Sequence, residues 1–295
     1  MGQHSAIAIG KQLIQSGARR LGYTVAKLPI ADLSRYEEFP VESLAGRRFY
    51  NIGAGSFSHA YWTNVDYGTE YYSSVQQPGF IDFDLTSLKP LPIGDDSAEI
   101  VYSSHTIEHV DDSAVRNMLS ESHRILKKGG LIRLVTPDAE LAFRAYRRRD
   151  RTFWSWVDKY SAPGTWERHY RRPLREASIS SLFLHYHASQ VCEIDADDTA
   201  VRKYCDREID EVFSRQPMES ALDFFTKQCV FNAERPGNHM NWWTHEKLSS
   251  MLRSVGFEDV YRSGYGQSVC RALRDLAVFD KSHAAISLYV EAQKS

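Results

Sequence analysis

The sequence lacks the features that would indicate a membrane or an oxidising environment. Its four cysteines in 295 residues show no Cys-x-x-Cys spacing, so we expect buried or free thiols in a reducing compartment. It has no apolar run long enough to span a bilayer and no apolar segment typical of a secretory signal. Internal repeats and low-complexity tracts are also missing. These absences predict a cytoplasmic protein without a membrane span.

The sequence also lacks an excess of charge of one sign. Its formal net charge is −2 and its pI is about 6.6, whereas nucleic-acid-binding domains are usually basic. We therefore expect no nucleic-acid partner. A hydrophobic content of 42% is enough to fill the core of one domain that carries an insertion.

The most informative stretch is Phe-Tyr-Asn-Ile-Gly-Ala-Gly-Ser-Phe at residues 49–57. Aromatic and β-branched residues followed by Gly53 and Gly55 predict a strand that ends in a tight turn. Glycine can adopt positive φ, and its backbone can lie close to a ligand. In a parallel α/β sheet, small molecules bind at this end of such a strand. By itself the motif also fits an ordinary loop.

Further strands are predicted at residues 62–66, 80–85, 99–104 and 131–135. The first of these ends at Asp66, whose two carboxylate oxygens could accept both hydroxyl protons of a ribose.

A helix is predicted from about residue 113 to residue 127. Basic residues and two glycines at 127–130 are typical of the C-terminal end of a helix. The strands and this helix together predict a parallel α/β sheet.

Seven short motifs then follow one another in a specific order. They are Asn-Ile-Gly-Ala-Gly at 51–55, Asn-Val-Asp at 64–66, Asp-Leu at 84–85, Leu-Pro-Ile-Gly-Asp-Asp-Ser at 91–97, Ser-Ser-His-Thr-Ile-Glu-His-Val at 103–110, Arg-Ile-Leu-Lys-Lys-Gly-Gly at 124–130 and Thr-Pro-Asp at 136–138. In this order they resemble class I S-adenosylmethionine-dependent methyltransferases, and most closely the bacterial branch found in surface-polysaccharide gene clusters.

This resemblance implies an α/β fold with a Rossmann-like, doubly wound, seven-stranded sheet, mostly parallel, with one antiparallel strand near the C-terminus. Residues 258–265 and 286–292 would form the last two strands. The implied domains are an N-terminal helical extension at 1–45, a core at 46–140 and 241–295, and a mostly helical insertion or lid at 141–240, after strand 5.

The resemblance also implies S-adenosyl-L-methionine as cofactor and S-adenosyl-L-homocysteine as product. The implied cofactor-binding residues are Asn51, Gly53, Gly55, Asp66, Asp84, Leu85 and Ser104. Two positions depart from the family pattern. Asn51 stands where the family usually has an acidic residue, and residues 58–61 are too few for the usual first helix, so we expect a loop there.

The insertion contains a basic stretch interleaved with aromatic residues. Its arginines are Arg147, Arg148, Arg149, Arg151, Arg168, Arg171, Arg172 and Arg175. One interpretation is a site for an anionic acceptor such as a nucleotide-sugar or a phosphoglycan. The other is a solvated helix face that is balanced by acidic residues at 193–211.

The resemblance implies methyl transfer, with O-methylation of a sugar or glycan precursor as the predicted reaction. An oxygen acceptor of high pKa needs a base to take its proton. His105 is the first candidate because it follows the fourth predicted strand, and Asp138 and His239 are the alternatives. Each of the three could instead make a structural hydrogen bond.

Residues 105–109, His-Thr-Ile-Glu-His, also match the inverted zinc-protease pattern His-x-x-Glu-His. A zinc hydrolase that uses His105, Glu108 and His109 is therefore an alternative, but the sequence specifies no third protein ligand for a catalytic zinc. We therefore expect no metal site. A catalytically inactive binding protein with the methyltransferase fold is a further alternative, which Asn51 permits.

Overall fold

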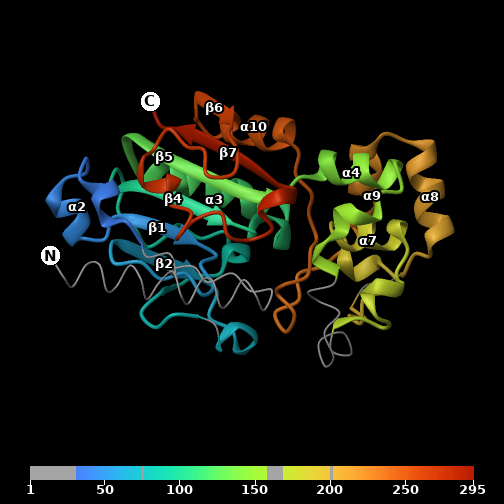
Figure 1. The fold of residues 1–295 in the computed structure, drawn as a ribbon. Coiled ribbons are helices and arrows are strands. Elements are labelled where there is room, and N and C mark those ends of the chain that lie inside the picture. Colours follow the sequence, from blue (N-terminus) through green and yellow to red (C-terminus); the bar gives the residue numbers. More distant parts are fainter. Residues whose placement is uncertain (1–30, 75, 158–168, 200–201) are drawn as a thin grey trace, which may run out of the picture.

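The computed structural model describes residues 31–74, 76–157, 169–199 and 202–295 (Figure 1). The helix expected near residues 7–21 lies outside the described residues. Within the described residues, no helix is long and apolar enough to cross a membrane.

A seven-stranded sheet with the order β3-β2-β1-β4-β5-β7-β6 forms the centre of the protein. β7 pairs antiparallel with both of its neighbours, and all other pairs are parallel. This topology confirms the predicted fold class. The strands are β1 (Phe49–Ile52), β2 (Trp62–Asp66), β3 (Ile81–Asp82), β4 (Ala98–Ser104), β5 (Leu126–Pro137), β6 (Asp259–Arg262) and β7 (Ser287–Gln293).

Most of the longer helices begin at a side chain that caps their first turn. The carboxylates of Asp111 and Asp138 and the hydroxyl of Thr244 accept hydrogen bonds from the backbone N–H three residues later. The helices are α2 (Val41–Ala45), α3 (Asp112–Ile125), α4 (Ala139–Arg147), α7 (Ile179–His185), α8 (Asp206–Arg215), α9 (Met218–Thr226) and α10 (His245–Ser254). As expected, no helix connects β1 to β2.

The structure corrects the boundary that the sequence placed at residues 127–130. These residues are the first part of β5 and do not end α3, because β5 already begins at Leu126, which pairs with Ala98. Gly129 N–H donates to the carbonyl of Lys294, 2.8 Å away, so the glycines are held by strand pairing with the C-terminal residues. Such pairing is non-local and leaves no signal in the local sequence.

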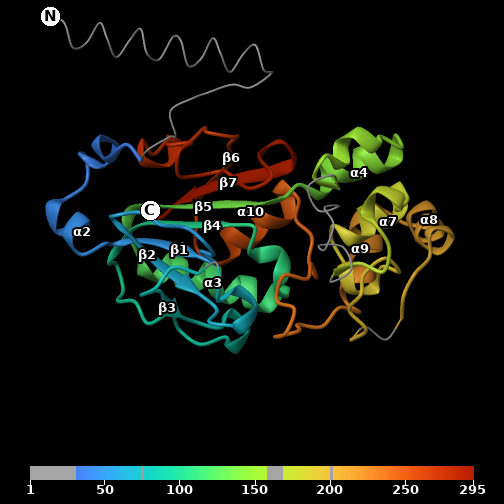
Figure 2. The ribbon, with the colours of Figure 1, turned by 60° about the horizontal axis from the view of Figure 1, so that its bottom comes forward.

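The two faces of the sheet are covered differently. α3 and α10 lie on one face of the sheet, as Figure 2 shows. Apolar side chains of these helices, such as Leu119 and Leu252, belong to the buried cluster on this face. On the other face, residues 33–45 and 263–286 bring in an aromatic cluster. These segments consist of 3₁₀ turns, loops and the short helix α2. Among the described residues, longer helices therefore cover one face of the sheet and mostly irregular segments cover the other.

A buried charged group anchors residues 263–286, one of the two segments that cover this face, to the sheet. The guanidinium of Arg133, on β5, is fully buried and lies 2.5 Å from carboxylate oxygens of both Asp280 and Glu291. Because a buried charge is tolerated only when it is paired, this triad fixes the course of the chain at residue 280.

The residues after β5 form a helical part with its own apolar core. α4, α7, α8 and α9 pack around buried aromatic residues such as Phe183 and Phe225, and lie beyond the carboxyl ends of the parallel strands (Figure 1). The chain then returns to the sheet, where Trp243 is buried against Ile107.

One buried group in the helical part makes stability depend on pH. His187 is fully buried, neither of its ring nitrogens has a hydrogen-bond partner, and burial lowers its pKa to about 3. Its pKa is near 6.5 when unfolded, so the unfolded chain binds the extra proton as the pH falls below that value. The free energy of unfolding that the neutral, buried His187 contributes is fully present above pH 6.5. It is lost progressively as the pH falls toward 3.

We therefore predict that His187→Leu reduces the pH dependence of folding. Between pH 7.5 and 5.5, wild type should lose roughly 1–1.5 kcal/mol of unfolding free energy that the variant keeps. Urea unfolding of both proteins at the two pH values measures this difference. Equal losses in the two proteins would show that His187 is not the source.

Candidate active site

Two cavities lie side by side at the carboxyl ends of the parallel strands. The glycine-loop cavity has a volume of about 320 Å³ and lies over β1, β2 and β4. The histidine cavity has a volume of about 410 Å³ and lies between the sheet and the helical part. Tyr72, His105, His109 and Ser282 line both cavities, so the two spaces meet at these residues.

All the predicted cofactor residues except Asn51 line the glycine-loop cavity. They are Gly53, Gly55, Asp66, Asp84, Leu85 and Ser104. Asn51 comes directly before Ile52 on β1 and lines an adjoining hollow of about 400 Å³. This hollow shares Gly53, Ser104 and Ser282 with the glycine-loop cavity. The structure thus brings together residues from four strand ends.

Asp66 is held in place by the glycine turn itself. One carboxylate oxygen accepts the N–H of Gly55 at 2.8 Å, and the other accepts the N–H of Tyr67 at 2.8 Å. A carboxylate has about four lone-pair positions, so Asp66 can still accept the two hydroxyl protons of a ribose. Asp84 is similarly fixed, because its carboxylate caps the 3₁₀ turn Leu85–Ser87.

Two buried polar atoms under the glycine turn have no hydrogen-bond partner. They are Asn51 Oδ1 and Ser104 Oγ, in the neighbouring strands β1 and β4. A buried acceptor without a partner costs free energy, so these atoms fit a ligand that brings its own donors. The ammonium group of an amino acid is a donor of this kind.

The backbone is strained where β4 ends. His105 has φ of +53°, which is unusual for a residue other than glycine, and its N–H is held by the carbonyl of Val135 at 2.8 Å. This conformation turns the imidazole toward the junction of the cavities. Its Nδ1 lies 3.0 Å from Glu108 Oε1 and its Nε2 lies 2.9 Å from Ser287 Oγ.

Glu108 lies beneath the junction and is 1% exposed. Burial alone would raise its pKa, but the hydrogen bond and charge of His105, followed by the charge of His109, outweigh burial and hold the pKa well below its usual range. Glu108 is therefore ionised. Because an ionised carboxylate can only accept, the hydrogen of His105 is on Nδ1, and a neutral His105 presents its lone pair at Nε2.

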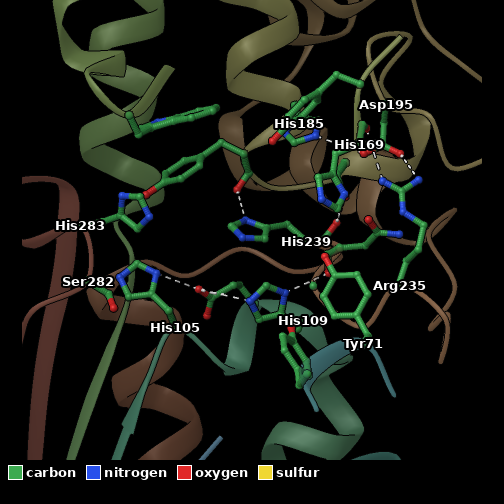
Figure 3. Close-up of a pocket in the computed structure, with 18 residues that line it drawn as sticks. Tyr71, His105, His109, His169, His185, Asp195, Arg235, His239, Ser282 and His283 are labelled. Carbon is green, nitrogen blue, oxygen red and sulfur yellow. Dashed lines mark hydrogen bonds and ion pairs between the residues drawn. The ribbon is translucent and has the colours of Figure 1, made fainter. Parts of the chain in front are cut away.

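His109 and His239 lie next to each other in the histidine cavity, as Figure 3 shows. Their ring centres are 4.7 Å apart with the rings nearly perpendicular. Burial, and repulsion from His109, lower the pKa of His239 well below its usual value, so this ring is neutral. His239 reaches the site from the segment that returns from the helical part.

Asp138 follows β5 as expected, but its carboxylate has other partners. One oxygen accepts the N–H of Leu141 and caps α4, while the other lies 2.7 Å from the guanidinium of Arg262. Asp138 lines neither cavity. The structure therefore brings His105 and His239 together and leaves Asp138 outside the group.

Aromatic and charged residues from the helical part, and from the 3₁₀ turn Glu70–Tyr72 after β2, complete the histidine cavity, and the sequence did not single them out as site residues. The aromatic ones are Tyr71, Tyr72, Trp156, Tyr170 and Tyr186. His185 and Arg235 also line it, and both contact the buried carboxylate of Asp195, at 3.1 Å and 3.2 Å. No local spacing signals this set, because its members are brought together by tertiary packing.

The described arginines of the basic stretch line neither cavity. Arg149, Arg171 and Arg172 pair with acidic side chains, and Arg151 donates to backbone carbonyls. Arg168 lies outside the described residues. Among the described residues, this stretch therefore behaves as a charge-balanced surface.

Residues 52–134 match the family described as a methyltransferase domain. This match runs from the end of β1 into β5 and includes the glycine turn, Asp66 and the segment 105–109. No curated protein matches the sequence.

Several solved structures are similar to the chain at low identity. An S-adenosylmethionine-dependent methyltransferase from Archaeoglobus fulgidus is 15% identical with a TM-score of 0.39, and the match covers 89% of this chain and 91% of that one. A methyltransferase from Thermotoga maritima, described as a possible histamine N-methyltransferase, is 16% identical with a TM-score of 0.38, covering 84% and 82%. These scores are too low to carry an argument, so the conclusion rests on the family match. The chain contains a methyltransferase domain, and its cofactor is S-adenosylmethionine.

The two glycines of the turn have different surroundings. A Cβ on Gly53, where φ is +71°, would lie 2.1 Å from Thr106 Oγ1 and 2.8 Å from Thr106 Cβ. A Cβ on Gly55, where φ is +52°, would meet nothing within 4 Å.

We predict that Gly53→Ala is far more damaging than Gly55→Ala. Gly55→Ala should cost only the left-handed backbone strain, about 1–2 kcal/mol of unfolding free energy. Gly53→Ala must also displace Thr106 and should cost roughly 3 kcal/mol or more. Thermal and urea unfolding of both variants test this order, and equal costs would contradict the close contact with Thr106.

Proposed function

We propose that this S-adenosylmethionine-dependent methyltransferase transfers its methyl group to a hydroxyl of a sugar or glycan precursor. The observation that carries this proposal is the position of His105, which lines both cavities and holds a lone pair at the point where they meet. A donor in one cavity and an acceptor in the other would then react across His105.

The glycine-loop cavity is the proposed cofactor site. Asp66 would accept the ribose hydroxyls, and Asp84 with Leu85 would lie beside the adenine. Asn51 and Ser104 would accept hydrogen bonds from the amino group of the methionine portion, which gives their unpaired oxygens partners. An amide oxygen can accept this hydrogen bond although it lacks the charge of the acidic residue usual in the family.

The histidine cavity is the proposed acceptor site. A sugar presents apolar C–H faces and polar hydroxyl edges, and this cavity offers matching groups in its tyrosines, histidines and the Asp195–Arg235 pair. Arg235 is neutralised by Asp195, and the described arginines of the basic stretch lie elsewhere. These features favour an uncharged hydroxyl acceptor over an anionic group.

The reaction requires little chemistry from the protein. S-adenosylmethionine supplies an activated methyl group, so the protein mainly provides proximity and orientation. The acceptor oxygen forms a bond to the methyl carbon as the carbon–sulfur bond breaks, and S-adenosylhomocysteine leaves. The hydroxyl proton passes to His105 Nε2, whose ring is oriented by the bond from Nδ1 to Glu108. The acceptor hydroxyl would take the place of Ser287 at this nitrogen.

For the cofactor, we predict that Asp66→Ala weakens S-adenosylmethionine binding by about 1.5–3 kcal/mol, the contribution of charged hydrogen bonds. Asp82→Ala is the matched control. Asp82 is also an acidic residue at a strand end that accepts a backbone N–H, but it lies outside both cavities. Isothermal calorimetry on both variants measures the difference, and equal affinities would contradict the role of Asp66.

For the base, we predict that His105→Ala lowers the rate of methyl transfer by roughly 10²–10⁴, the usual contribution of general base catalysis. Affinity for S-adenosylmethionine should change little. His123→Gln, on α3 and outside both cavities, should keep the wild-type rate.

The measurement is single-turnover transfer from labelled S-adenosylmethionine to a panel of sugars and nucleotide-sugars. Wild-type transfer rates in the His105→Ala variant would show that another group takes the proton. Cofactor binding without transfer to any member of the panel would instead favour the inactive binding protein.

A further inference from the structure

We propose that Glu108, His109 and His239 bind one divalent transition-metal ion. The three residues come from two segments, the 3₁₀ turn after β4 (Ile107–His109) and the chain before α10. One ligand atom from each lies within 4.8 Å of the other two, and all three residues line the histidine cavity. The sequence suggested Glu108 and His109, together with His105, as parts of a metal site and named His239 only as a candidate base. In the structure His239 takes the place of His105 in the cluster.

The backbone around the histidines fixes the ring nitrogens that could bind a metal. His109 Nδ1 lies 3.1 Å from the carbonyl of Asn238, and His239 Nδ1 lies 2.7 Å from the carbonyl of Tyr186. A carbonyl can only accept, so both Nδ1 atoms carry the hydrogen and both Nε2 atoms are free to bind a metal. Metal-binding histidines commonly donate their second ring nitrogen to a backbone carbonyl in this way.

The three ligand atoms also need a positive partner. Glu108 Oε1 is buried and lies 3.0 Å from His105 Nδ1 and 3.9 Å from His109 Nε2. His105 supplies one hydrogen to this oxygen, and a carboxylate oxygen has a second lone pair. With both Nδ1 hydrogens of His109 and His239 committed, two nitrogen lone pairs and this remaining oxygen lone pair converge without a donor between them. A cation at this point would satisfy all three.

The donor set indicates the class of metal. Two imidazoles and one carboxylate suit zinc and neighbouring first-row metals, whereas magnesium and calcium prefer oxygen ligands. Three protein ligands also leave coordination positions open, which is typical of catalytic sites and not of structural ones. The histidine cavity gives an acceptor access to those positions.

The metal site would add a catalytic ion to the proposed function. This role of the ion, but not metal binding itself, rests on the proposed function. An acceptor hydroxyl bound to the ion would be more acidic and would be held beside the methyl group. Its proton would pass to His105 Nε2, the oxygen–carbon bond would form as the carbon–sulfur bond breaks, and the ion would keep its charge. Metal binding itself does not depend on that role.

The test uses untagged full-length protein, stripped with a chelator and titrated with Co²⁺ and Zn²⁺. Wild type should bind one equivalent of Zn²⁺ by calorimetry, and Co²⁺ should give the visible absorption bands of an ion with protein ligands. We expect Zn²⁺ binding to weaken about 100-fold or more in each of the variants Glu108→Gln, His109→Gln and His239→Gln. Changing a residue that only hydrogen-bonds to a metal ligand typically weakens metal binding about 10–100-fold. His169→Gln and His283→Gln change histidines of the same cavity that lie outside the cluster and should bind Zn²⁺ like wild type.

Circular dichroism and S-adenosylmethionine affinity, measured on every variant, show whether it is folded. The inference is overturned if wild type gives no Co²⁺ bands and no stoichiometric Zn²⁺ binding, whatever the variants do. It is also overturned if folded ligand variants bind Zn²⁺ as tightly as the two controls. Methyl transfer that continues in the stripped protein would remove the catalytic role of the ion and leave the proposed function intact. Metal binding without cofactor binding would instead count against the proposed function alone.

Discussion

The site depends on the buried carboxylate of Glu108. A carboxylate that is 1% exposed needs partners, because an isolated buried charge is strongly unfavourable. Its neighbours come from three parts of the chain: His105 and His109 beside it, Thr136 at the end of β5, and His239 from the segment that follows the helical part. One charge therefore ties the edge of the sheet to the segment returning from the helices, and both cavities meet at this point.

The sheet and the helical part contribute to the site in different ways. The strand ends supply rigid groups of fixed geometry, such as Asp66, whose carboxylate is bound by the turn that it faces. The helical part supplies broad aromatic and charged surfaces that shape the histidine cavity. The buried Arg133–Asp280–Glu291 triad holds the covering segment, which brings Ser282 to the junction of the cavities. The sheet edge and the histidine cavity are therefore built by separate parts of the chain that meet at shared residues.

The strand positions and the start of α3 could be predicted, because apolar periodicity and helix-start residues are local signals. The early start of β5 could not be predicted from the sequence. Leu126 belongs to the strand because it pairs with Ala98, and not because of its own neighbours in the sequence. Asp138 illustrates the same limit within the site. Its position after a strand was predicted correctly, but the cap of α4 and the pairing with Arg262 engage its carboxylate elsewhere.

The sequence by itself indicated the methyltransferase fold and the cofactor, through the resemblance of its seven ordered motifs to that family. It also pointed to His105 through its position after a strand. Only the tertiary structure decided that His239 lies beside His109 and Glu108, because α3, β5 and the helical part separate these residues in the sequence. That contact depends on how the helical part packs and returns to the sheet, and the buried atoms that direct it are backbone carbonyls, which no residue pattern encodes.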